Sequence, residues 1–483
     1  MTLATEILNL KTLVTSLLSR VTQLEQENAE LRQENMLLSQ ENAVLRQENI
    51  ELKARLQQNS KNSSKPPSSE GLAKKPAIAK ISGKKVGGQY KHIGKTLEMV
   101  ATPDATIIHF PHVCQNCNGT LSQKDVVKTA SKHQVFDLPP TKLIVTEHQI
   151  GISLCQCGCQ NKATLPYGLA TSPVQYGSNI KALAVYLNTD FKIPFQKIST
   201  LFGDLYGYEF NPSTAFSANV LAYGKLEPIE NQITQALLEA KVIHVDETGI
   251  RTQGTLQWLH VACNSLFSYF FVHPKRGKEA IESEQSILPE FENYLMHDCW
   301  ASYFGLDKAT HLICNAHVVR ELQALIENGS QWAAIMQKYL LNLFEISKQE
   351  PLHQRLIPKY VQEFHQICRQ GFHQEPLPIK TEGKKGRVKK SKGRNLLERL
   401  SQNQDAVLSF AFHQDLPFTN NHAERDLRPV KTKQKVSACF RTIAGANHYA
   451  RIQGFIATVR KQHLNPFIQL QNVFQNQFDW KTC

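Results

Sequence analysis

The sequence has no long hydrophobic run and no recognisable export signal. No stretch approaches the roughly 20 consecutive apolar residues that a membrane-spanning helix needs. The N-terminal residues, MTLATEILNL, include an acid but no basic residue, whereas a secretory signal begins with basic residues. We therefore expect a cytoplasmic protein that is neither secreted nor inserted in a membrane.

Acidic residues are scarce relative to basic ones. The 483 residues include 42 Asp and Glu against 55 Lys and Arg, which gives a formal net charge of +13 at pH 7. This balance is typical of a soluble protein whose partners are polyanions. The chain is also too long for one ordinary domain of roughly 100 to 200 residues, so we expect a multidomain protein.

The cysteines lack the pattern of a disulfide framework. Their number, 11, is odd, and some gather in two groups while the others are scattered, which is typical of a metal site in a reducing compartment. A Cys-x-x-Cys pair, then the strand-like text TKLIVTEHQIGISL and a second group, predict a zinc ribbon over residues 99–170. The alternative is a small β module with free thiols. The expected ligands of the structural Zn²⁺ are Cys114, Cys117, Cys155 and either Cys157 or Cys159.

Leucine occupies every seventh position from Leu10 to Leu52, which predicts a coiled coil over residues 1–56. The other core position of the heptad holds a run of asparagines from Asn28 to Asn49. Buried asparagine at this position favours two parallel strands, and the flanking positions pair residues of opposite charge. We expect a parallel homodimer. A single solvated helix is the alternative, although it would not need the leucine column.

Residues 57–98 are rich in Ser, Pro, Gly and Lys and poor in large apolar residues, which predicts a basic disordered linker. Lys84 and Lys85 are candidates for contacts with the phosphates of nucleic acid. A solvated linker without such contacts is equally compatible with this composition.

Residues 171–235 contain three short segments with apolar residues at helical spacing, IKALAVYLN, PFQKISTLFGDLYG and PSTAFSANVLAYG. A glycine-containing turn before the third segment completes a pattern that resembles a helix-turn-helix. Small helical bundles that bind nothing share this pattern, so both interpretations are open for this helical segment.

Three acids stand at the ends of candidate elements in the second half of the chain. Asp246 follows the strand-like text KVIHV, Asp298 follows FENYLMH, and Glu424 lies in FTNNHAERDLRPV, where Asn420 or Asn421 can cap a helix. The intervening text alternates strands and helices, which indicates an open α/β sheet with its site at strand ends. Three carboxylates can hold two Mg²⁺ or Mn²⁺ ions about 3.5 to 4 Å apart. Taken singly, each acid is more often only a turn residue or a cap.

Several motifs in order make the chain resemble transposases of the IS66 family over almost its whole length. They are the leucine-rich N-terminus, SSKPPSSE, GGQYKHIGKTLEMV, the cysteine pairs, HVDETG, DCWASY, CNAHVVREL and NNHAERDLRPVK. The resemblance implies an RNase H-like catalytic core with a DDE triad of Asp246, Asp298 and Glu424. We assign residues 236–460 to this core and residues 461–483 to a C-terminal tail. The CQCGC group departs from the family pattern, which leaves the zinc ligands open.

The long separation of Asp298 from Glu424 implies a helical insertion at about residues 330–400. The centre of this insertion is one of the most basic stretches of the chain, and it either clamps DNA or is a solvated loop. The candidate DNA contacts within it are Lys384, Lys385, Arg387, Lys389 and Lys390.

Residues near the expected site are candidates for supporting roles. His317 and Arg320 lie in CNAHVVREL, where they can approach the scissile phosphate. Cys314 and His317 also offer two metal ligands, but a strand cysteine is more often a buried apolar group.

Arg425 and Arg428 flank Glu424, so an arginine over phosphate oxygens is one interpretation of this segment. Structural pairing of these arginines with Asp426 or Glu321 is the other.

The sequence therefore predicts a DDE transposase that cleaves the ends of an insertion sequence and transfers them to target DNA with the help of Mg²⁺. The expected partners are DNA and a second copy of the chain, and the resemblance adds accessory proteins of the same element. We expect it in the bacterial cytoplasm, on the nucleoid when bound. One rival is a non-catalytic DNA-binding regulator on a degenerate core, and another is a metal-dependent nuclease that cuts without joining.

Overall fold

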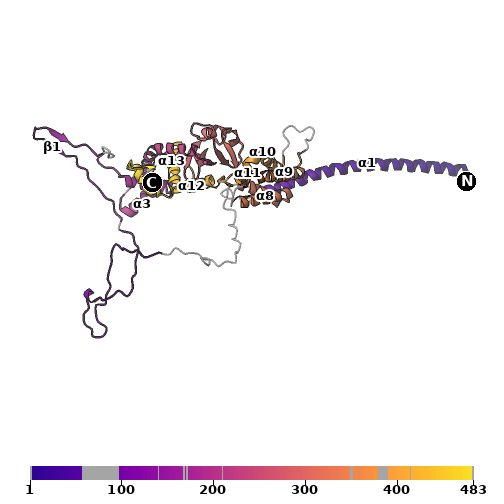
Figure 1. Cartoon of the computed structure of the whole chain (residues 1–483). Coiled ribbons are helices and arrows are strands. Elements are labelled where there is room, and N and C mark those ends of the chain that lie inside the picture. Colours follow the sequence, from indigo (N-terminus) through magenta and orange to yellow (C-terminus); the bar gives the residue numbers. More distant parts are fainter. Residues whose placement is uncertain are drawn as a thin grey trace. The chain divides into compact units, whose positions relative to one another are not determined.

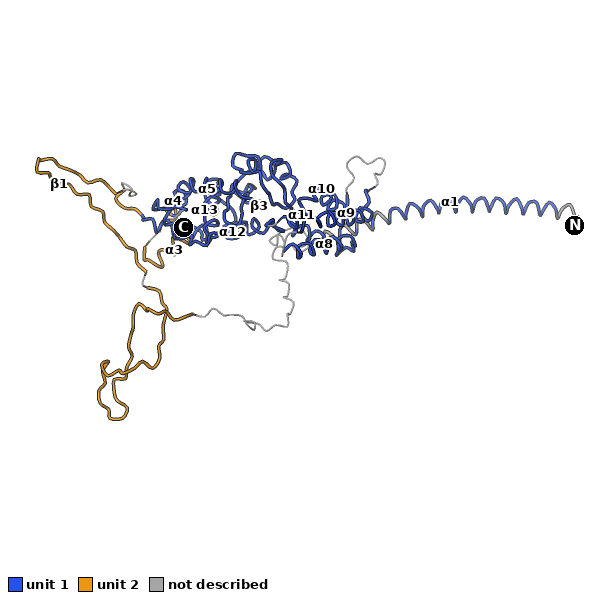
Figure 2. The backbone as a smooth tube through the Cα atoms, in the orientation of Figure 1, with its two compact units in different colours: residues 1–71, 176–194, 215–483 blue, residues 72–175, 195–214 orange. Residues whose placement is uncertain are grey.

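The computed structural model describes residues 3–56, 97–139, 141–166, 169, 172–208, 210–348, 352–378, 390–413 and 415–480. Within these ranges no helix is long and apolar enough to cross a membrane. The chain forms two compact units, which are described separately below (Figure 2). The predicted linker lies outside the described residues except at its last two positions, and so do Lys84, Lys85, Lys384, Lys385, Arg387 and Lys389.

A single long helix, α1 (Leu3–Leu56), forms the N-terminal part of the chain (Figure 1). It confirms the helix predicted for this region. The leucines of the seven-residue repeat, from Leu10 to Leu52, are each 48% to 64% exposed along it. The side chains of Asn28, Asn42 and Asn49 donate to backbone carbonyls four residues earlier. A helix that leaves such an apolar stripe in water has a face suited to a partner, and the parallel dimer stays a prediction.

The second compact unit contains residues 72–175 and 195–214. Its regular elements are a short antiparallel hairpin of β1 (Ile152–Leu154) and β2 (Gln160–Lys162), a 3₁₀ turn (Gln123–Asp125) and helix α3 (Phe195–Tyr206). The strand expected over TKLIVTEHQIGISL is thus wrong except at its end. Val135 and Val145 are each 90% exposed in this unit. β-branched residues favour a strand only where a neighbouring strand or layer packs against them, and these two lack that packing.

A mixed sheet of five strands forms the centre of the other unit, in the order β5-β4-β3-β6-β7. Strands β3, β4 and β5 are antiparallel neighbours, whereas β6 and β7 run parallel to β3. Each of the strands expected after residue 240 is confirmed. Their bounds are β3 (Val242–Thr252), β4 (Thr255–Cys263), β5 (Ser268–His273), β6 (Tyr294–His297) and β7 (Thr310–Ile313).

Helices cover both faces of this sheet because β3 is apolar on both sides. Ile243 and Val245 pack in one hydrophobic cluster with helix α5 (Glu227–Leu238). Ile250 points to the other face and packs in a second cluster with α12 (Asn421–Ser437) and α13 (Ile443–Lys461). Alternating residues of β3 therefore face different helical layers. A short helix, α6 (Lys278–Ile281), and two 3₁₀ turns (Leu288–Glu290 and Tyr303–Gly305) connect β5, β6 and β7.

The three helices expected within residues 171–235 are present, and α5 is a fourth. Helices α2 (Ser178–Thr189) and α4 (Pro212–Lys225) share a hydrophobic cluster with α13 and α14 (Pro466–Phe474). Helix α3 belongs to the other compact unit. The helix-turn-helix therefore stays a prediction. Helix α14 lies where a C-terminal tail was expected, and it is packed by Leu470 and Val473 into this cluster.

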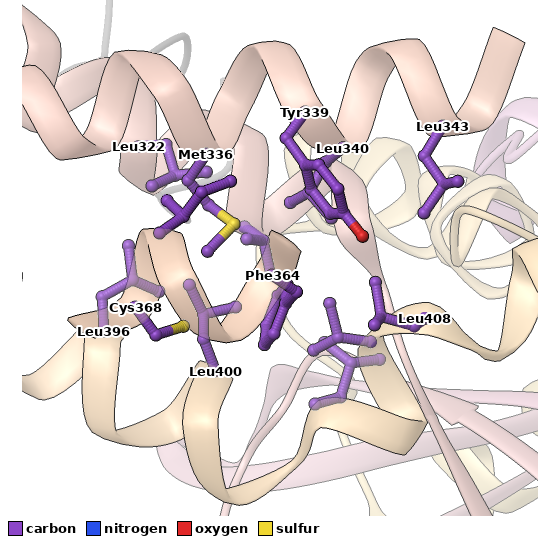
Figure 3. Close-up of a cluster of buried hydrophobic side chains, with 14 of the residues drawn as sticks. Leu322, Met336, Tyr339, Leu340, Leu343, Phe364, Cys368, Leu396, Leu400 and Leu408 are labelled. Atoms are coloured by element: carbon purple, nitrogen blue, oxygen red, sulfur yellow. The ribbon is translucent and has the colours of Figure 1, made fainter. Parts of the chain in front are cut away.

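The segment between β7 and α12 is a helical layer with its own hydrophobic core (Figure 3). Leu322, Met336, Phe364, Leu396 and Leu408 come from five different helices and point toward one another in this core (Figure 3). The insertion expected at about residues 330–400 is thus a packed unit rather than an extended excursion. The helices are α7 (Asn315–Glu327), α8 (Gln331–Ser347), α9 (Ile357–Gln374), α10 (Lys392–Gln402) and α11 (Gln404–Phe412), with a 3₁₀ turn at Gln354–Leu356.

Two adjacent leucines of α1 offer a test of the predicted dimer. Leu38 lies in the heptad seam and Leu37 outside it, with exposures of 48% and 57%. We expect Leu38→Lys to weaken dimerisation at least about a hundredfold, since burial of one leucine contributes about 1.5 to 3 kcal/mol and two copies are lost. Leu37→Lys should leave the dimer intact. Sedimentation equilibrium of the full chain measures both, and equal effects of the two changes or a trimeric mass would contradict the prediction.

Candidate active site

Asp246 and Glu247 are adjacent on β3 but serve opposite faces of the sheet. Glu247 points toward the face covered by α5, where its side chain is only 1% exposed. Asp246 points to the face covered by α12 and is partly buried, and its Oδ1 accepts from the Glu247 backbone N–H at 2.8 Å. The alternation of a β-strand produces this separation, so two neighbouring carboxylates have different environments.

Glu247 is neutralised within a closed network of side chains. The Arg276 guanidinium contacts Glu247 Oε1 through Nε at 2.7 Å and Nη2 at 2.6 Å, and the Tyr303 hydroxyl donates to Oε2. The same guanidinium lies over the rings of Trp258 and Trp300, at 5.1 and 4.2 Å from their centroids. With its acceptor sites satisfied in this way, Glu247 acts as a structural anchor for the turn that contains Trp300 and Tyr303.

Asp298 starts the loop after β6, which is the parallel neighbour of β3. The pairing of the two strands runs from Val242 with Tyr294 to His244 with Met296. Continued by two residues, this register would place Asp246 opposite Asp298, which lies just beyond the end of β6. Asp298 Oδ1 accepts from the Trp300 N–H at 3.0 Å, so the turn anchored by Glu247 also orients this carboxylate.

Asn420 fixes the start of the helix that carries Glu424, but its side chain does not cap that helix. Its side chain is completely buried and donates from Nδ2 to the Val245 carbonyl at 2.8 Å. Its Oδ1 lies 3.0 Å from His244 Nδ1, and burial lowers the pKa of His244 to about 4, so a neutral imidazole donates this bond. Asn420 or Asn421 was expected to cap this helix, and for the side chain of Asn420 that is wrong. Its amide instead ties α12 to β3 at His244 and Val245.

The loop before α12 is also tied to β7 and α7. The Asn420 N–H donates to Cys314 Sγ at 3.1 Å, and the Asn315 N–H donates to the Phe418 carbonyl at 3.0 Å. Cys314 is buried, and burial raises the pKa of its thiol to about 11, so the thiol is a neutral acceptor here. These bonds close the long insertion at its base.

Glu424 lies on the first turn of α12 and faces two residues of α7. Its Oε1 lies 3.4 Å from Arg320 Nη2 and 3.8 Å from His317 Nε2. The supporting residues expected from CNAHVVREL are thus next to the third acid. Burial lowers the pKa of His317, with the charge of Arg320 as the next cause, which favours a neutral ring.

The three acids share one electrostatic environment. Burial raises the pKa of Asp246 well above its ordinary value, and the negative charges of Glu247, Asp298 and Glu424 raise it further. Lys431, further along α12, is close enough to Asp246 for the two charges to interact. Accumulated negative charge with hard oxygen donors is the environment in which Mg²⁺ or Mn²⁺ binds, so the residues present fit such ions.

Within the described residues, one group has three candidate ligand atoms within 4.8 Å of one another, and it consists of Cys314, His317 and Glu424. The triad does not form such a group, so the oxygens of Asp246, Asp298 and Glu424 are not all within that distance.

Arg425 and Arg428 are exposed on α12. Their proposed structural partners are engaged elsewhere, because Asp426 pairs with Lys461 at 2.7 Å and Glu321 pairs with Arg399. Pairing of these arginines with Asp426 or Glu321 is therefore wrong, and phosphate contacts stay a prediction.

Two other positively charged residues of the insertion are engaged in ion pairs within it. Lys390, expected as a DNA contact, pairs with Glu398 at 2.5 Å, so its charge is already partnered. Arg399 reaches the site from α10 and lines a small cavity together with Asp298 and His317.

The cysteines of the second compact unit lie in two tight turns. The backbone N–H of Cys117 lowers the pKa of Cys114, and the backbone N–H of Cys159 lowers the pKa of Cys157. These bonds favour thiolates, which are the form that binds Zn²⁺. In the described residues the two turns do not combine into a group of four ligands. The donor chemistry fits zinc, and the ribbon stays a prediction.

Sequence reasoning missed the residues that support the acids. Trp300 and Tyr303 stand in DCWASY, so the motif contained them, but their role depends on which residues lie across the sheet. Arg276 belongs to no motif and is brought to Glu247 only by the fold. Asn420 stands in NNHAERD, where capping was the simplest interpretation.

The paired asparagines Asn420 and Asn421 allow a direct test of the buried tie. Asn420→Ala should reduce the free energy of unfolding by at least about 2 kcal/mol, because it leaves the His244 N–H and the Val245 carbonyl buried without partners. Asn421 is exposed, and Asn421→Ala should change the free energy of unfolding by less than about 0.5 kcal/mol. Urea denaturation of both variants gives these values, and equal losses would show that Asn420 is an ordinary helix-end residue.

Two family models match the chain. The model described as Transposase IS66 family matches residues 173–448, a range that includes all three acids and the residues that tie them together. A model described as a family of unknown function (DUF6444) matches residues 16–98. No curated protein matched the chain in a sequence search. Because the first model covers more than half of the residues, the chain belongs to the IS66 transposase family.

Proposed function

We propose that this transposase cleaves DNA at the ends of an insertion sequence and joins them to target DNA, with Asp246, Asp298 and Glu424 as its catalytic triad. Family membership implies DNA binding and the use of divalent metal ions. The proposal is supported by the parallel pairing of β3 with β6, which ends two residues before Asp246 and Asp298, and by the Asn420 amide, which ties the helix of Glu424 to β3.

The proposed core is RNase H-like. Three antiparallel strands followed by two parallel ones, in the order β5-β4-β3-β6-β7, support this assignment. The acids come from the central strand, from the end of its parallel neighbour and from a helix across one face. In open α/β sheets the carboxyl ends of neighbouring parallel strands form such sites.

Two bound Mg²⁺ or Mn²⁺ ions would activate the attacking oxygen and stabilise the leaving oxygen at phosphorus. The chain supplies the carboxylates that hold them, on elements fixed by backbone pairing and by buried hydrogen bonds. Arg320 is 25% exposed beside Glu424, where its guanidinium can contact a phosphate oxygen. In the proposed reaction, water opens the phosphodiester to free a 3′-hydroxyl, which then attacks a target phosphodiester in line.

The remaining parts of the chain are assigned by proposal to DNA and to self-association. The parallel dimer of α1, the zinc ribbon and the helical segment would position two catalytic cores on two DNA ends. The lysines and Arg387 outside the described residues, and the exposed Arg425 and Arg428, are proposed phosphate contacts. Accessory proteins of the same element are proposed partners on the basis of the family resemblance.

Neighbouring acids allow a sharp test of the triad. Asp298→Asn, Asp246→Asn and Glu424→Gln should each slow cleavage of element-end DNA at least about a hundredfold, because each carboxylate contributes to metal contacts that supply several kcal/mol. Glu247→Gln should have a milder effect, within about tenfold, because Glu247 points to the opposite face of β3. DNA affinity should persist in all four variants, because it depends mainly on Lys and Arg contacts to phosphate.

The measurements are 3′-end cleavage, strand transfer and binding in Mg²⁺, with thermal unfolding as a readout independent of activity. Mg²⁺ should raise the melting temperature of the wild type more than that of Asp298→Asn. Near wild-type cleavage by Asp298→Asn, or an essential Glu247 with a dispensable Asp246, would overturn the assignment. Cleavage without strand transfer would instead identify a nuclease.

The zinc assignment has its own test. None of the described residues between 97 and 166 is buried, so this segment needs another source of folding energy, and a structural zinc would supply it. Cys117→Ser should lower bound zinc from one ion per chain to none and make this segment sensitive to proteolysis, while Asp246 and its surroundings stay folded. The exposed Cys439, outside both turns, provides Cys439→Ser as the control. Elemental analysis that finds no stoichiometric zinc in the wild type would refute the assignment.

A further inference from the structure

A cavity of about 380 Å³ lies beside the turn that joins β3 and β4, away from the acids. Its wall is formed by this turn, by the end of β5 and by the start of α13. No Lys, Arg, Asp or Glu is among the described residues that line it. The polar side chains of the wall are uncharged amides, two hydroxyls and an imidazole, those of Thr252, Gln253, Thr255, Gln257, His273, Gln285 and Asn447.

The backbone around the cavity is held rigidly. Gln253 and Gly254 have φ values of 52° and 78°, the geometry of a tight two-residue hairpin turn between the paired Thr252 and Thr255. The chain after α12 adds a further connection, because the Gln253 N–H donates to the Phe440 carbonyl at 3.1 Å. A wall fixed in this way is formed before any ligand arrives.

One buried hydroxyl in the wall has no partner within the described part of the chain. Thr252 is 4% exposed, and its Oγ1 makes no hydrogen bond there. This hydroxyl is covered by protein atoms rather than open to the cavity, so the uncharged amides of the wall are the groups available to a ligand.

The lining selects the chemistry of that ligand. Without a charged side chain the cavity offers nothing to a phosphate or a metal ion, each of which needs charge or several oxygen ligands. Amides and hydroxyls instead match the donors and acceptors on the edge of a nucleobase, and Gln or Asn can pair with adenine through two hydrogen bonds. Val272, Pro274 and Ile443 supply the apolar surface that the flat face of a base requires.

We propose that this cavity receives a single unstacked nucleobase of the DNA on which the proposed transposase acts. The proposal rests on the proposed DNA function and adds a specific recognition site to it. Thr252 is on the same strand and faces the same side as Asp246, about 20 Å away at 3.3 Å per residue. That distance corresponds to about six nucleotides of DNA at 3.4 Å each, so the base would belong to a flank of the cleaved position.

The experiment uses the full chain and three fluorescent DNA duplexes of one sequence. One is fully paired, one carries a single bulged adenine, and one carries an abasic nucleotide in place of that adenine. We expect about tenfold tighter binding of the adenine bulge than of the abasic bulge, since stacking and edge contacts with one base are lost in the latter. Fluorescence anisotropy at fixed salt gives the dissociation constant of each duplex and hence the ratio of affinities.

Two nearly isosteric variants test the cavity. Gln257→Leu and Asn447→Leu should bring the ratio of the affinities for the adenine-bulged and abasic duplexes close to one. Their affinity for the paired duplex should be unchanged, which also shows that the variants fold correctly. Gln475→Leu, an exposed amide outside the cavity, should keep the tenfold ratio. A ratio near one in the wild type, or an unchanged ratio in both cavity variants, would overturn the inference. Absence of binding to all three duplexes would overturn the proposed DNA function itself.

Discussion

The candidate site depends on one buried amide, the side chain of Asn420. A helix that begins more than a hundred residues after Asp298 has to arrive at a defined position over β3, and apolar packing alone would allow it to slide. The Asn420 amide prevents this because its donor and its acceptor each have one partner, the Val245 carbonyl and the His244 ring. Both partners come directly before Asp246 in the sequence. A displacement of α12 would therefore leave three buried polar groups unsatisfied.

The helical insertion can be large because its first and last residues lie next to each other. Its hydrophobic core is separate from the clusters on the two faces of the sheet, so its helices pack among themselves. At its base, the Asn315 side chain donates to the Val407 carbonyl at 2.9 Å, and the Asn315 N–H donates to the Phe418 carbonyl at 3.0 Å. The two ends of the insertion thus meet at the start of α7. The geometry of the acids is consequently independent of the length of the chain between them.

Much of this arrangement could be predicted from sequence, in particular wherever periodicity and local order decide the structure. The leucine repeat gave a helix over the expected residues, and the strands around HVDETG and DCWASY were found because they are short, apolar and bounded by polar residues. The opposite orientation of Asp246 and Glu247 follows from the pleat of a strand alone.

Where sequence reasoning failed, the deciding partner was distant in the chain. TKLIVTEHQIGISL has strand-forming residues, but a strand also needs a neighbour, and only Ile152–Leu154 has one in the described part. Asn420 was expected to satisfy its own helix, whereas its partners lie on β3. Arg276 neutralises Glu247 from a loop that contains no recognisable motif. The family motifs suggested the acids from sequence alone, but the supporting contacts depend on strand order and on which face each residue occupies.

The order of the acids along the chain has a consequence for protein synthesis. Asp246 and Asp298 leave the ribosome well before Glu424, and the whole insertion has to emerge and fold between them. A nascent chain therefore possesses α1, with its exposed leucines, long before it possesses a complete set of acids. In the proposed dimer, a polypeptide that terminates before Phe418 would keep the self-association helix and lack the third acid.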